Sequence, residues 1–349
     1  MNDHIPALGA IPSPHDYRDG IAAGVPVAPI ALPATFDTQM PGPVLMQAQT
    51  PSCVSHSVAQ VLQLYYFRKT GQLIDFSPRF LDVLAKRFDG QPLDGGTIPR
   101  LVFSLAVKYG CATTATLPND TSLPLAQYRN DAVLTPEVFA DAAKYKIPGY
   151  QRIPDEFNAT RQAVYLHGAV SVLMQVGDTW WVPSWQPADI DPLRTPAPVI
   201  GGHQIVVKGW TSDTLNKLRN SWSANWDLQG EAHYDPNAWA PFVIEGWVIA
   251  EIPQDVKDFL STLPTSSDFH YAWNTNLALG QTNDDVKFMQ IALMILGFLA
   301  PIPANELGIY GPKTANAVKA YQISKRISPQ APNNVGPRTR AALNMDFSI

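Results

Sequence analysis

The spacing of hydrophobic residues changes along this chain, and the change constrains the fold more than any other feature. From 53 to 68, hydrophobic residues recur every three or four positions, which predicts a helix. Further helices are predicted over 77–88, with Ser77 as N-cap, and over 97–109. Beyond about residue 145 the pattern predicts buried strands, over 169–176, 203–210, 215–220 and 232–234. Helices followed by strands indicate an α+β fold with a cleft between two halves.

An internal repeat predicts a second domain at the C-terminal end. The stretch Gly311-Pro312-Lys313-Thr314 returns 25 residues later (336 − 311) as Gly336-Pro337-Arg338-Thr339, and each copy should begin a helix. A helix over 284–297 precedes them, so this domain should be a small three-helix unit. The predicted division is an extended N-terminal arm, a main α+β domain, a linker and the helical domain, over 1–35, 36–255, 256–271 and 272–349.

Composition and charge narrow the function classes. The chain is 46% hydrophobic and 16% charged, so it can bury large cores. A net charge of −5 gives no reason to expect a nucleic-acid partner. The first six residues, MNDHIP, lack the features of a secretory signal, so we expect cytoplasmic synthesis without a signal peptide. The longest hydrophobic run, Ile291 to Ala300, is too short for a membrane span.

One of only two cysteines, Cys53, stands at the start of the helix predicted over 53–68. A cysteine in this place is ordinarily a small core residue. A helix N-terminus and a neighbouring imidazolium nevertheless lower a thiol pKa, and the thiolate is a strong nucleophile. The position of Cys53 therefore leaves a structural role and a catalytic role open.

Three other features favour catalysis. His203 follows Gly201-Gly202 and should stand at the mouth of the most hydrophobic strand. Asn220 could accept the imidazole N–H and fix the ring, with Trp222 shielding that bond from water. The Gln47 side chain, six residues before Cys53, could join the Cys53 backbone N–H in binding an oxyanion.

In the order Gln47, Cys53, His203, Asn220, these residues resemble the papain-like (cathepsin-type) cysteine peptidases. The resemblance runs from about residue 32 to 253. It includes Ser77-Pro78-Arg79-Phe80, Asp94-Gly95-Gly96-Thr97 and Arg219-Asn220-Ser221-Trp222. It implies a two-lobed fold, with a helical lobe, a β-barrel-like lobe and the active site between them.

The resemblance also implies a role for each of the four residues. Cys53 would be the nucleophile and His203 the general base and acid. Asn220 would orient His203, and Gln47 with the Cys53 amide would form the oxyanion hole. The reaction would be acyl transfer, in which an acyl-enzyme forms on the sulfur and water releases it.

Four positions depart from the family pattern. Val54 replaces the aromatic residue that usually follows the nucleophile, and Thr50 stands where secreted relatives carry a disulfide cysteine. Ser223 and Asp227 replace glycines of the loop beyond Asn220. These changes motivate a rival hypothesis, a catalytically inactive binding protein of the same fold. The family's long propeptide is also expected to be missing, and residues 1–35 are candidates for an arm that lies across the cleft and restrains activity.

Other candidate residues receive structural interpretations. His56 lies one turn beyond Cys53, poorly placed for proton transfer, and Cys111 is expected to be a buried spectator thiol. The histidines show no metal-binding spacing, so no metal or other cofactor is expected. The tryptophans near Pro183 either line the cleft or pack beneath a loop; they are Trp180, Trp181 and Trp185.

The C-terminal domain resembles the peptidoglycan-binding domains of bacterial and phage wall hydrolases. The resemblance covers about 272–345 and includes Leu296-Gly297-Phe298, Tyr310-Gly311 and Tyr321-Gln322. Seven basic and four acidic residues give 272–349 a charge of +3 (7 − 4), which suits an anionic wall. A structural or dimerising appendage is the alternative.

The sequence therefore predicts a cysteine endopeptidase with a wall-binding-like module. The catalytic half favours a protein or peptide substrate. The C-terminal half favours the peptide cross-links of peptidoglycan, with 272–349 as the anchor, and such an enzyme would be released to act at the cell wall. No nucleic-acid partner is expected in either case.

Overall fold

A computed structural model describes residues 7–14, 31–153, 157–177, 180, 198–212, 214–250, 269–296, 298–299, 304–325, 327 and 334–347. The chain divides into two compact units. Unit 1 consists of Met1–Ser13 and Val25–Glu251, and unit 2 consists of Pro14–Gly24 and Ile252–Ile349. No helix within the described ranges is long and apolar enough to cross a membrane.

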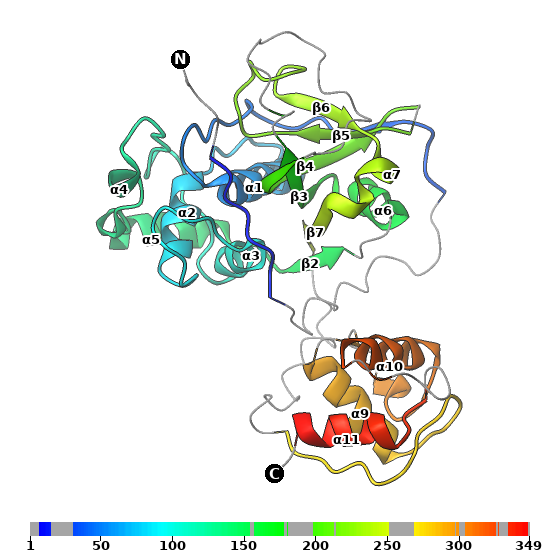
Figure 1. Ribbon diagram of the computed structural model, residues 1–349. Coiled ribbons are helices and arrows are strands. Elements are labelled where there is room, and N and C mark those ends of the chain that lie inside the picture. Colours follow the sequence, from blue (N-terminus) through cyan, green and yellow to red (C-terminus); the bar gives the residue numbers. More distant parts are fainter. Residues whose placement is uncertain are drawn as a thin grey trace. The chain divides into compact units, whose positions relative to one another are not determined.

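Helices make up the first half of unit 1. They are α1 (Cys53–Thr70), α2 (Pro78–Lys86), α3 (Pro99–Lys108), α4 (Leu125–Tyr128) and α5 (Pro136–Ala142), with short 3₁₀ turns at Asp131–Val133 and Ala143–Tyr145. The predicted N-cap of α2 is confirmed, because the Ser77 hydroxyl accepts the Phe80 N–H and Pro78 occupies the first helical position. Figure 1 shows α2 to α5 gathered on one side of α1 and the sheet on the other.

An antiparallel sheet makes up the second half of unit 1. Its strands are β1 (Phe36–Asp37), β2 (Tyr150–Ile153), β3 (Val170–Gly177), β4 (Val199–Trp210), β5 (Asn216–Arg219), β6 (Glu231–Tyr234) and β7 (Val243–Ile249). The order is β2-β7-β3-β4-β5-β6, and β1 pairs with β4. The described residues of unit 1 also form helices α6 (Phe157–His167) and α7 (Pro236–Trp239) and a 3₁₀ turn (Ala240–Phe242).

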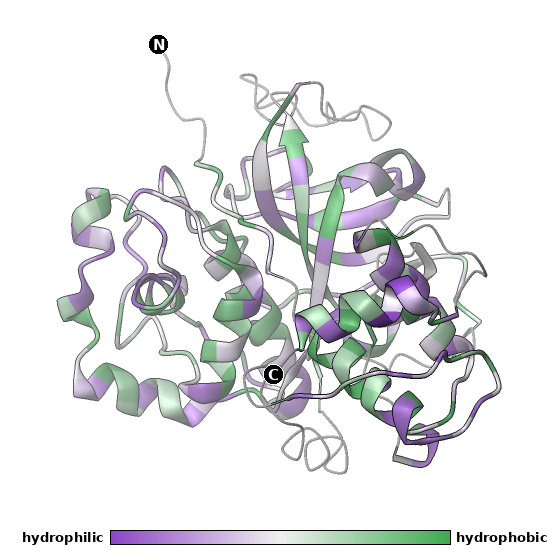
Figure 2. Cartoon of the chain, turned by 60° about the horizontal axis from the view of Figure 1, so that its bottom comes forward, coloured by the Kyte–Doolittle hydropathy of each residue, from purple (hydrophilic) through white to green (hydrophobic). Residues whose placement is uncertain are grey.

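Two hydrophobic cores lie on opposite faces of this sheet. One joins α1, α2 and α3 to sheet residues such as Leu173, Val206 and Trp247. The other, rich in tryptophan, joins α6 to Val172, Ile205 and Trp239. Hydrophobic residues accordingly recur along the strands and along the helices beside them (Figure 2). Because α1 belongs to the first core, its N-terminus is held against the sheet.

Two sequence predictions need correction. The strand predicted over 203–210 begins at Val199, so Gly201-Gly202 lie within β4 and His203 pairs with Met174 of β3 instead of standing at a strand mouth. Glycine lowers strand propensity, but the ladder to β3 overrides that local preference. Helix α6 was not predicted because its sequence, FNATRQAVYLH, lacks strong helix signals, and tertiary packing decides its state.

Within its described residues, unit 2 contains the three expected helices. Its helices are α9 (Asp284–Ile295), α10 (Pro312–Ser324) and α11 (Pro337–Asp346), with a 3₁₀ turn at Ala304–Glu306. The repeated Gly-Pro pairs begin α10 and α11, with proline at the first helical position. The Asn283 side chain caps α9 by accepting the Val286 N–H.

Candidate active site

Cys53 is the first residue of α1, where the helix meets β4. The Ser57 hydroxyl, one turn further on, donates to the Ile205 carbonyl at 3.0 Å. The backbone N–H groups of Gln204 and Val54 point to the Cys53 sulfur. Since Gln204 is the neighbour of His203 in β4, the packing of α1 on the sheet brings the two predicted catalytic residues into one small region.

His203 is fixed by a hydrogen bond on one side of its ring and a stacking contact on its face. Its Nε2 lies 2.7 Å from Asn220 Oδ1, an oxygen that also accepts the Ser221 N–H at 2.8 Å. The Trp222 ring lies over the imidazole, with centroids 4.6 Å apart. Because Oδ1 can only accept, Nε2 carries the hydrogen and Nδ1 of the neutral ring is an acceptor. Among the described residues Nδ1 has no hydrogen-bond partner.

Gln47 ties the loop before α1 to the loop after β5. Its Oε1 accepts the Ser221 hydroxyl at 2.7 Å, and its backbone N–H donates to the Ser221 carbonyl at 2.9 Å. Its Nε2 donates to the carbonyl of Ala7 at 2.7 Å and to that of Thr50 at 3.1 Å. The side-chain N–H expected to bind an oxyanion therefore already holds a backbone carbonyl of the N-terminal segment.

Residues 7–13 belong to the first described segment of the predicted N-terminal arm (1–35), and from here on they alone are called the arm. They run along the boundary between the helices and the sheet (dark blue in Figure 1). On the helical side, the arm bonds to Thr97, whose N–H donates to the Gly9 carbonyl at 2.9 Å and whose carbonyl accepts the Ile11 N–H at 3.0 Å. On the sheet side, the Ala10 N–H donates to the Gly202 carbonyl at 3.2 Å. At the centre, the Gly9 N–H points to the Cys53 sulfur.

Three glycines allow the arm to approach this closely. A Cβ at Gly9 would lie 2.1 Å from the Pro51 carbonyl oxygen, and one at Gly96 would lie 2.2 Å from the Gly9 oxygen. A Cβ at Gly202 would lie 2.4 Å from the Ala10 oxygen. Only a residue without a side chain fits at each contact, so the arm and the backbone that it packs against are sterically matched.

The end of the arm reaches a buried carboxylate. The Ser13 N–H and hydroxyl donate to Glu245 Oε1 of β7, at 3.1 and 2.9 Å. Burial raises the pKa of Glu245, and the two bonds from Ser13 oppose that rise. Sequence analysis did not identify Glu245, because a single acidic residue within a strand gives no local signal.

Burial dominates the electrostatics of the site with the arm in place. It raises the pKa of the Cys53 thiol to about 11 and lowers the pKa of His203 to about 4. The hydrogen bond that His203 donates to Asn220 partly opposes this lowering of the His203 pKa. The thiolate expected from the helix N-terminus is therefore not the stable form here, because both side chains are fully buried.

His56 has the structural role that was predicted. Its Nδ1 donates to the Ser52 carbonyl at 2.9 Å, and its Nε2 accepts from the Asn119 amide at 3.1 Å. Burial lowers its pKa to about 4. His56 therefore holds the first turn of α1 as a neutral ring.

The remaining candidates can also be placed. Cys111 is a buried, free thiol, as predicted. Trp180 is buried against Trp222 and Trp226 and so packs in the core, whereas Trp181 and Trp185 lie outside the described residues. No group of three potential metal ligands occurs within the described ranges.

The two residues that replace family glycines keep the glycine-type backbone. Ser223 has φ 71° and Asp227 has φ 39°, both in the left-handed region. The loop beyond Asn220 thus has the backbone conformation that glycine favours, although neither residue is glycine. That finding weakens the main structural reason for the inactive-protein hypothesis.

Two known protein families match parts of this chain. Residues 32–238 match the family described as “Papain family cysteine protease”. That is 207 of 349 residues (238 − 32 + 1), so the chain belongs to the papain family of cysteine proteases. Residues 282–343 match the family described as “Putative peptidoglycan binding domain”. No curated protein matches the chain.

Solved structures that are similar to this chain include other cysteine proteases. Xylellain, a cysteine protease from Xylella fastidiosa, is 21% identical with a TM-score of 0.61, covering 71% of this chain and 97% of its own. Digestive procathepsin L 3 of Tenebrio molitor larval midgut is 18% identical (TM-score 0.49, covering 67% and 76%). The ragweed pollen allergen Amb a 11, a cysteine protease in its proform, is 18% identical (0.48, 64% and 67%). At 21% identity, the similarity to xylellain establishes the fold alone.

Proposed function

We propose that this protein hydrolyses peptide bonds with Cys53 as nucleophile, His203 as general base and acid, Asn220 as the group that orients His203, and Gln47 as oxyanion donor. The observation that carries the proposal is the ring of His203. Its Nε2–H is held by Asn220, and its Nδ1, which has no hydrogen-bond partner among the described residues, is left to accept a proton. This is the tautomer that a Cys–His pair requires.

The proposed reaction follows from these positions. Nδ1 of His203 takes the Cys53 proton, and the sulfur attacks the peptide carbonyl carbon. The carbonyl oxygen becomes negative where Gln47 Nε2 and the Cys53 N–H can donate. The C–N bond then breaks as His203 returns the proton to the leaving amine, and water hydrolyses the thioester.

We further propose that the arm restrains this activity. The Ala7 carbonyl accepts a hydrogen bond from Gln47 Nε2, and the Gly9 N–H points to the Cys53 sulfur. An amide N–H, and not a carbonyl carbon, faces Cys53, so the arm blocks the site without lying in position for attack. The raised pKa of Cys53 to about 11 is consistent with a restrained thiol, since water and counter-charge are both excluded.

A single substitution tests the arm in the full-length chain. Gly9→Ala places a Cβ 2.1 Å from the Pro51 oxygen, so the arm can no longer pack against Pro51 and must move away. We expect Cys53 to react at least tenfold faster with iodoacetamide and peptide hydrolysis to rise. Pro12→Ala, at an exposed position of the same segment, is the matched control. Equal rates for Gly9→Ala and the unmodified chain would refute restraint by the arm.

The nucleophile is tested in the Gly9→Ala background. We expect Cys53→Ala to abolish hydrolysis of a fluorogenic peptide and labelling by a thiol-reactive epoxide. Cys111→Ala, which removes the other thiol, should leave both intact. If the epoxide labels neither cysteine of the folded chain, the inactive binding protein becomes the better hypothesis.

Protein is the favoured substrate class, and the cross-links of peptidoglycan are the second. The second has its own support, because residues 282–343 match a peptidoglycan-binding family. Under it, the chain is made in the cytoplasm and released to act at the wall. Casein and purified wall sacculi should be digested side by side, with Cys53→Ala as control. Release of peptides from sacculi but not from casein would make peptidoglycan the favoured substrate class.

A further inference from the structure

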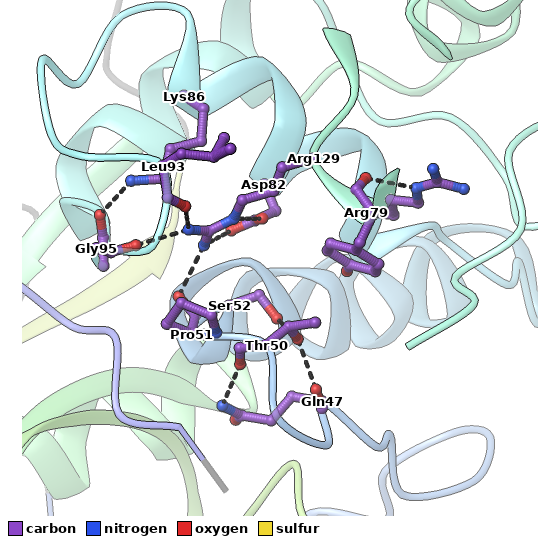
Figure 3. A network of polar contacts seen from close by, with 12 residues as sticks. Gln47, Thr50, Pro51, Ser52, Arg79, Asp82, Lys86, Leu93, Gly95 and Arg129 are labelled. Carbon is purple, nitrogen blue, oxygen red and sulfur yellow. Dashed lines mark hydrogen bonds and ion pairs between the residues drawn. The ribbon is translucent and has the colours of Figure 1, made fainter. Parts of the chain in front are cut away.

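Arg129 is a buried cation at the centre of a network beside the active site (Figure 3). The residue is 3% exposed and follows the short helix α4. Its Nε and Nη2 bond to the two carboxylate oxygens of Asp82 on α2, at 2.7 and 3.0 Å. Both side chains are completely buried. This two-point pairing fixes the guanidinium plane and leaves its remaining N–H groups for other acceptors.

Those remaining N–H groups bond to two separate loops (Figure 3). Nη2 donates to the Pro51 carbonyl at 3.0 Å, in the loop that carries Gln47 and leads into Cys53. Nη1 donates to the carbonyls of Leu93 and of Gly95, the latter at 2.7 Å. One planar group therefore joins the residues before the nucleophile to the loop at 92–97.

The loop at 92–97 supplies the backbone edge that holds an extended chain. Thr97 bonds to the arm through both its N–H and its carbonyl, as a strand does. Gly96 lets the arm backbone come close, since a Cβ there would lie 2.2 Å from the Gly9 oxygen. A substrate peptide that replaced the arm would find the same two hydrogen-bonding groups.

We propose that Arg129 is a positioning residue that holds the oxyanion and nucleophile loop (47–53) and the peptide-binding edge (92–97) in one relative position. The proposal rests on the peptidase function proposed above. Acyl transfer requires the bound carbonyl, the sulfur and the Gln47 N–H to be aligned within a fraction of an ångström. Both cysteines are free, so this connection is non-covalent and does not depend on an oxidising environment.

Lys86 provides a matched comparison, because it holds only one of the two loops. Its Nζ donates to the Pro92 carbonyl at 3.0 Å and to the Gly96 carbonyl at 2.7 Å, and it pairs with Asp89 at 3.0 Å. It bonds to the same edge as Arg129 but has no bond to the loop at 47–53 among the described residues. Loss of Lys86 should loosen the edge, whereas loss of Arg129 should uncouple the two loops.

Hydrogen exchange tests the connection without any need for catalysis. Arg129→Lys keeps a cation beside Asp82, but one ammonium group cannot reach three carbonyls in two loops. In the full-length chain we expect backbone exchange to rise at least tenfold in both 47–53 and 92–97. Lys86→Gln should raise it in 92–97 alone. If Arg129→Lys changes only one of the two segments, or neither, the proposal is wrong.

Kinetics test the consequence, in the full-length Gly9→Ala background. We expect Arg129→Lys to lower kcat for a fluorogenic peptide at least tenfold while the rate of Cys53 alkylation by iodoacetamide changes less than threefold. The small reagent needs a reactive thiol but no aligned peptide. Lys86→Gln should raise KM and leave kcat within twofold. An unchanged kcat in Arg129→Lys, or an equal loss of alkylation, would overturn the proposal.

A second variant covers the case in which Arg129→Lys does not fold. Replacing the pair together, as Asp82→Leu with Arg129→Met, leaves no unpaired buried charge. If this double variant folds and, in the Gly9→Ala background, has the same kcat as the Gly9→Ala chain, Arg129 has only a structural role and the proposal fails. If the Gly9→Ala chain has no peptidase activity at all, the function proposed above fails, and hydrogen exchange still decides whether Arg129 joins the two loops.

Discussion

His203 and His56 are neutral in the folded protein because both rings are fully buried. Each makes hydrogen bonds that fit the uncharged form, and burial lowers both pKa values to about 4. The nearby His56 ring adds to the lowering of the pKa of His203, because a charge on His56 disfavours a second charge on His203. Protonation of either ring therefore opposes folding.

The free energy of unfolding should therefore depend on pH, and the direction of the dependence follows from the lowered pKa values. Between about pH 6.5 and 4 the unfolded chain binds protons on His56 and His203 that the folded chain does not. The free energy of unfolding should therefore be greatest above pH 6.5 and should fall as the pH is lowered through this window. Each histidine contributes a slope of about 1.4 kcal/mol per pH unit.

The measurement is urea denaturation from pH 4.5 to 7, followed by circular dichroism. His56→Gln keeps a polar side chain and removes one titrating group, so its slope should be lower by about 1.4 kcal/mol per pH unit. A slope identical to that of the unmodified protein would show that His56 is not neutral in the fold.

Gln47 leads to a second prediction for a single residue. In the Gly9→Ala background, Gln47→Ala should lower kcat about 100-fold, because the proposed oxyanion donor is lost. KM should change little, since in the proposed role Gln47 acts on charge that appears only in the transition state. Gln49→Ala, the same change at an exposed position two residues on, is the control. A loss confined to KM would contradict the assigned role.

Among the elements, the repeat of unit 2 has a physical explanation that its sequence did not reveal. The Gln290 amide of α9 donates to Thr314 Oγ1 at the start of α10, at 2.9 Å. The Gln322 amide of α10 donates in the same way to Thr339 Oγ1 at the start of α11, at 3.0 Å. Each repeated Gly-Pro-basic-Thr stretch thus places a threonine where a buried glutamine of the preceding helix can reach it.

Gln290 should therefore be essential to unit 2. Besides its bond to Thr314, its amide donates to the Ile309 carbonyl at 2.8 Å, and its Oε1 accepts the Gly308 N–H at 2.7 Å. Gln290→Leu leaves these buried groups without partners and should destabilise unit 2 by about 1–3 kcal/mol. Calorimetry of the full chain should show the loss. Gln281→Leu, at an exposed position, should be nearly neutral, and equal effects would refute the explanation.

At the scale of the whole molecule, the opposite charges of the two domains predict a salt dependence for the proposed binding to a cell wall. Residues 272–349 carry +3, so the rest carries −8 (−5 − 3). If 272–349 binds the wall through this charge, retention of Cys53→Ala on purified sacculi should fall as NaCl rises from about 50 to 500 mM. Lys319→Glu should weaken retention, and Lys69→Glu, the same exchange at an exposed position of unit 1, should not. Equal effects of the two exchanges would contradict anchoring by this domain.

The sequence predicted the parts of the fold that depend on local patterns. Helix α1, the capped start of α2 and the Gly-Pro starts of α10 and α11 follow from spacing and capping within a few residues. The pairing of Asn220 with His203 was also expected, because residue type and order in a known family carry that information. Helix α6 and the true start of β4 were missed, since packing and strand pairing decide both.

By itself the sequence determined the chemical types present, their order along the chain and the two domain classes, because these depend on residue identity and short-range periodicity. Only the tertiary structure decided that a glycine of the arm would cover Cys53 and that Arg129 would reach two loops at once. These contacts join segments 44 and 78 residues apart (53 − 9 and 129 − 51), and they depend on buried backbone groups. A backbone carbonyl is chemically the same at every residue. Its hydrogen-bond partner is therefore decided by how the chain packs and not by the residue type.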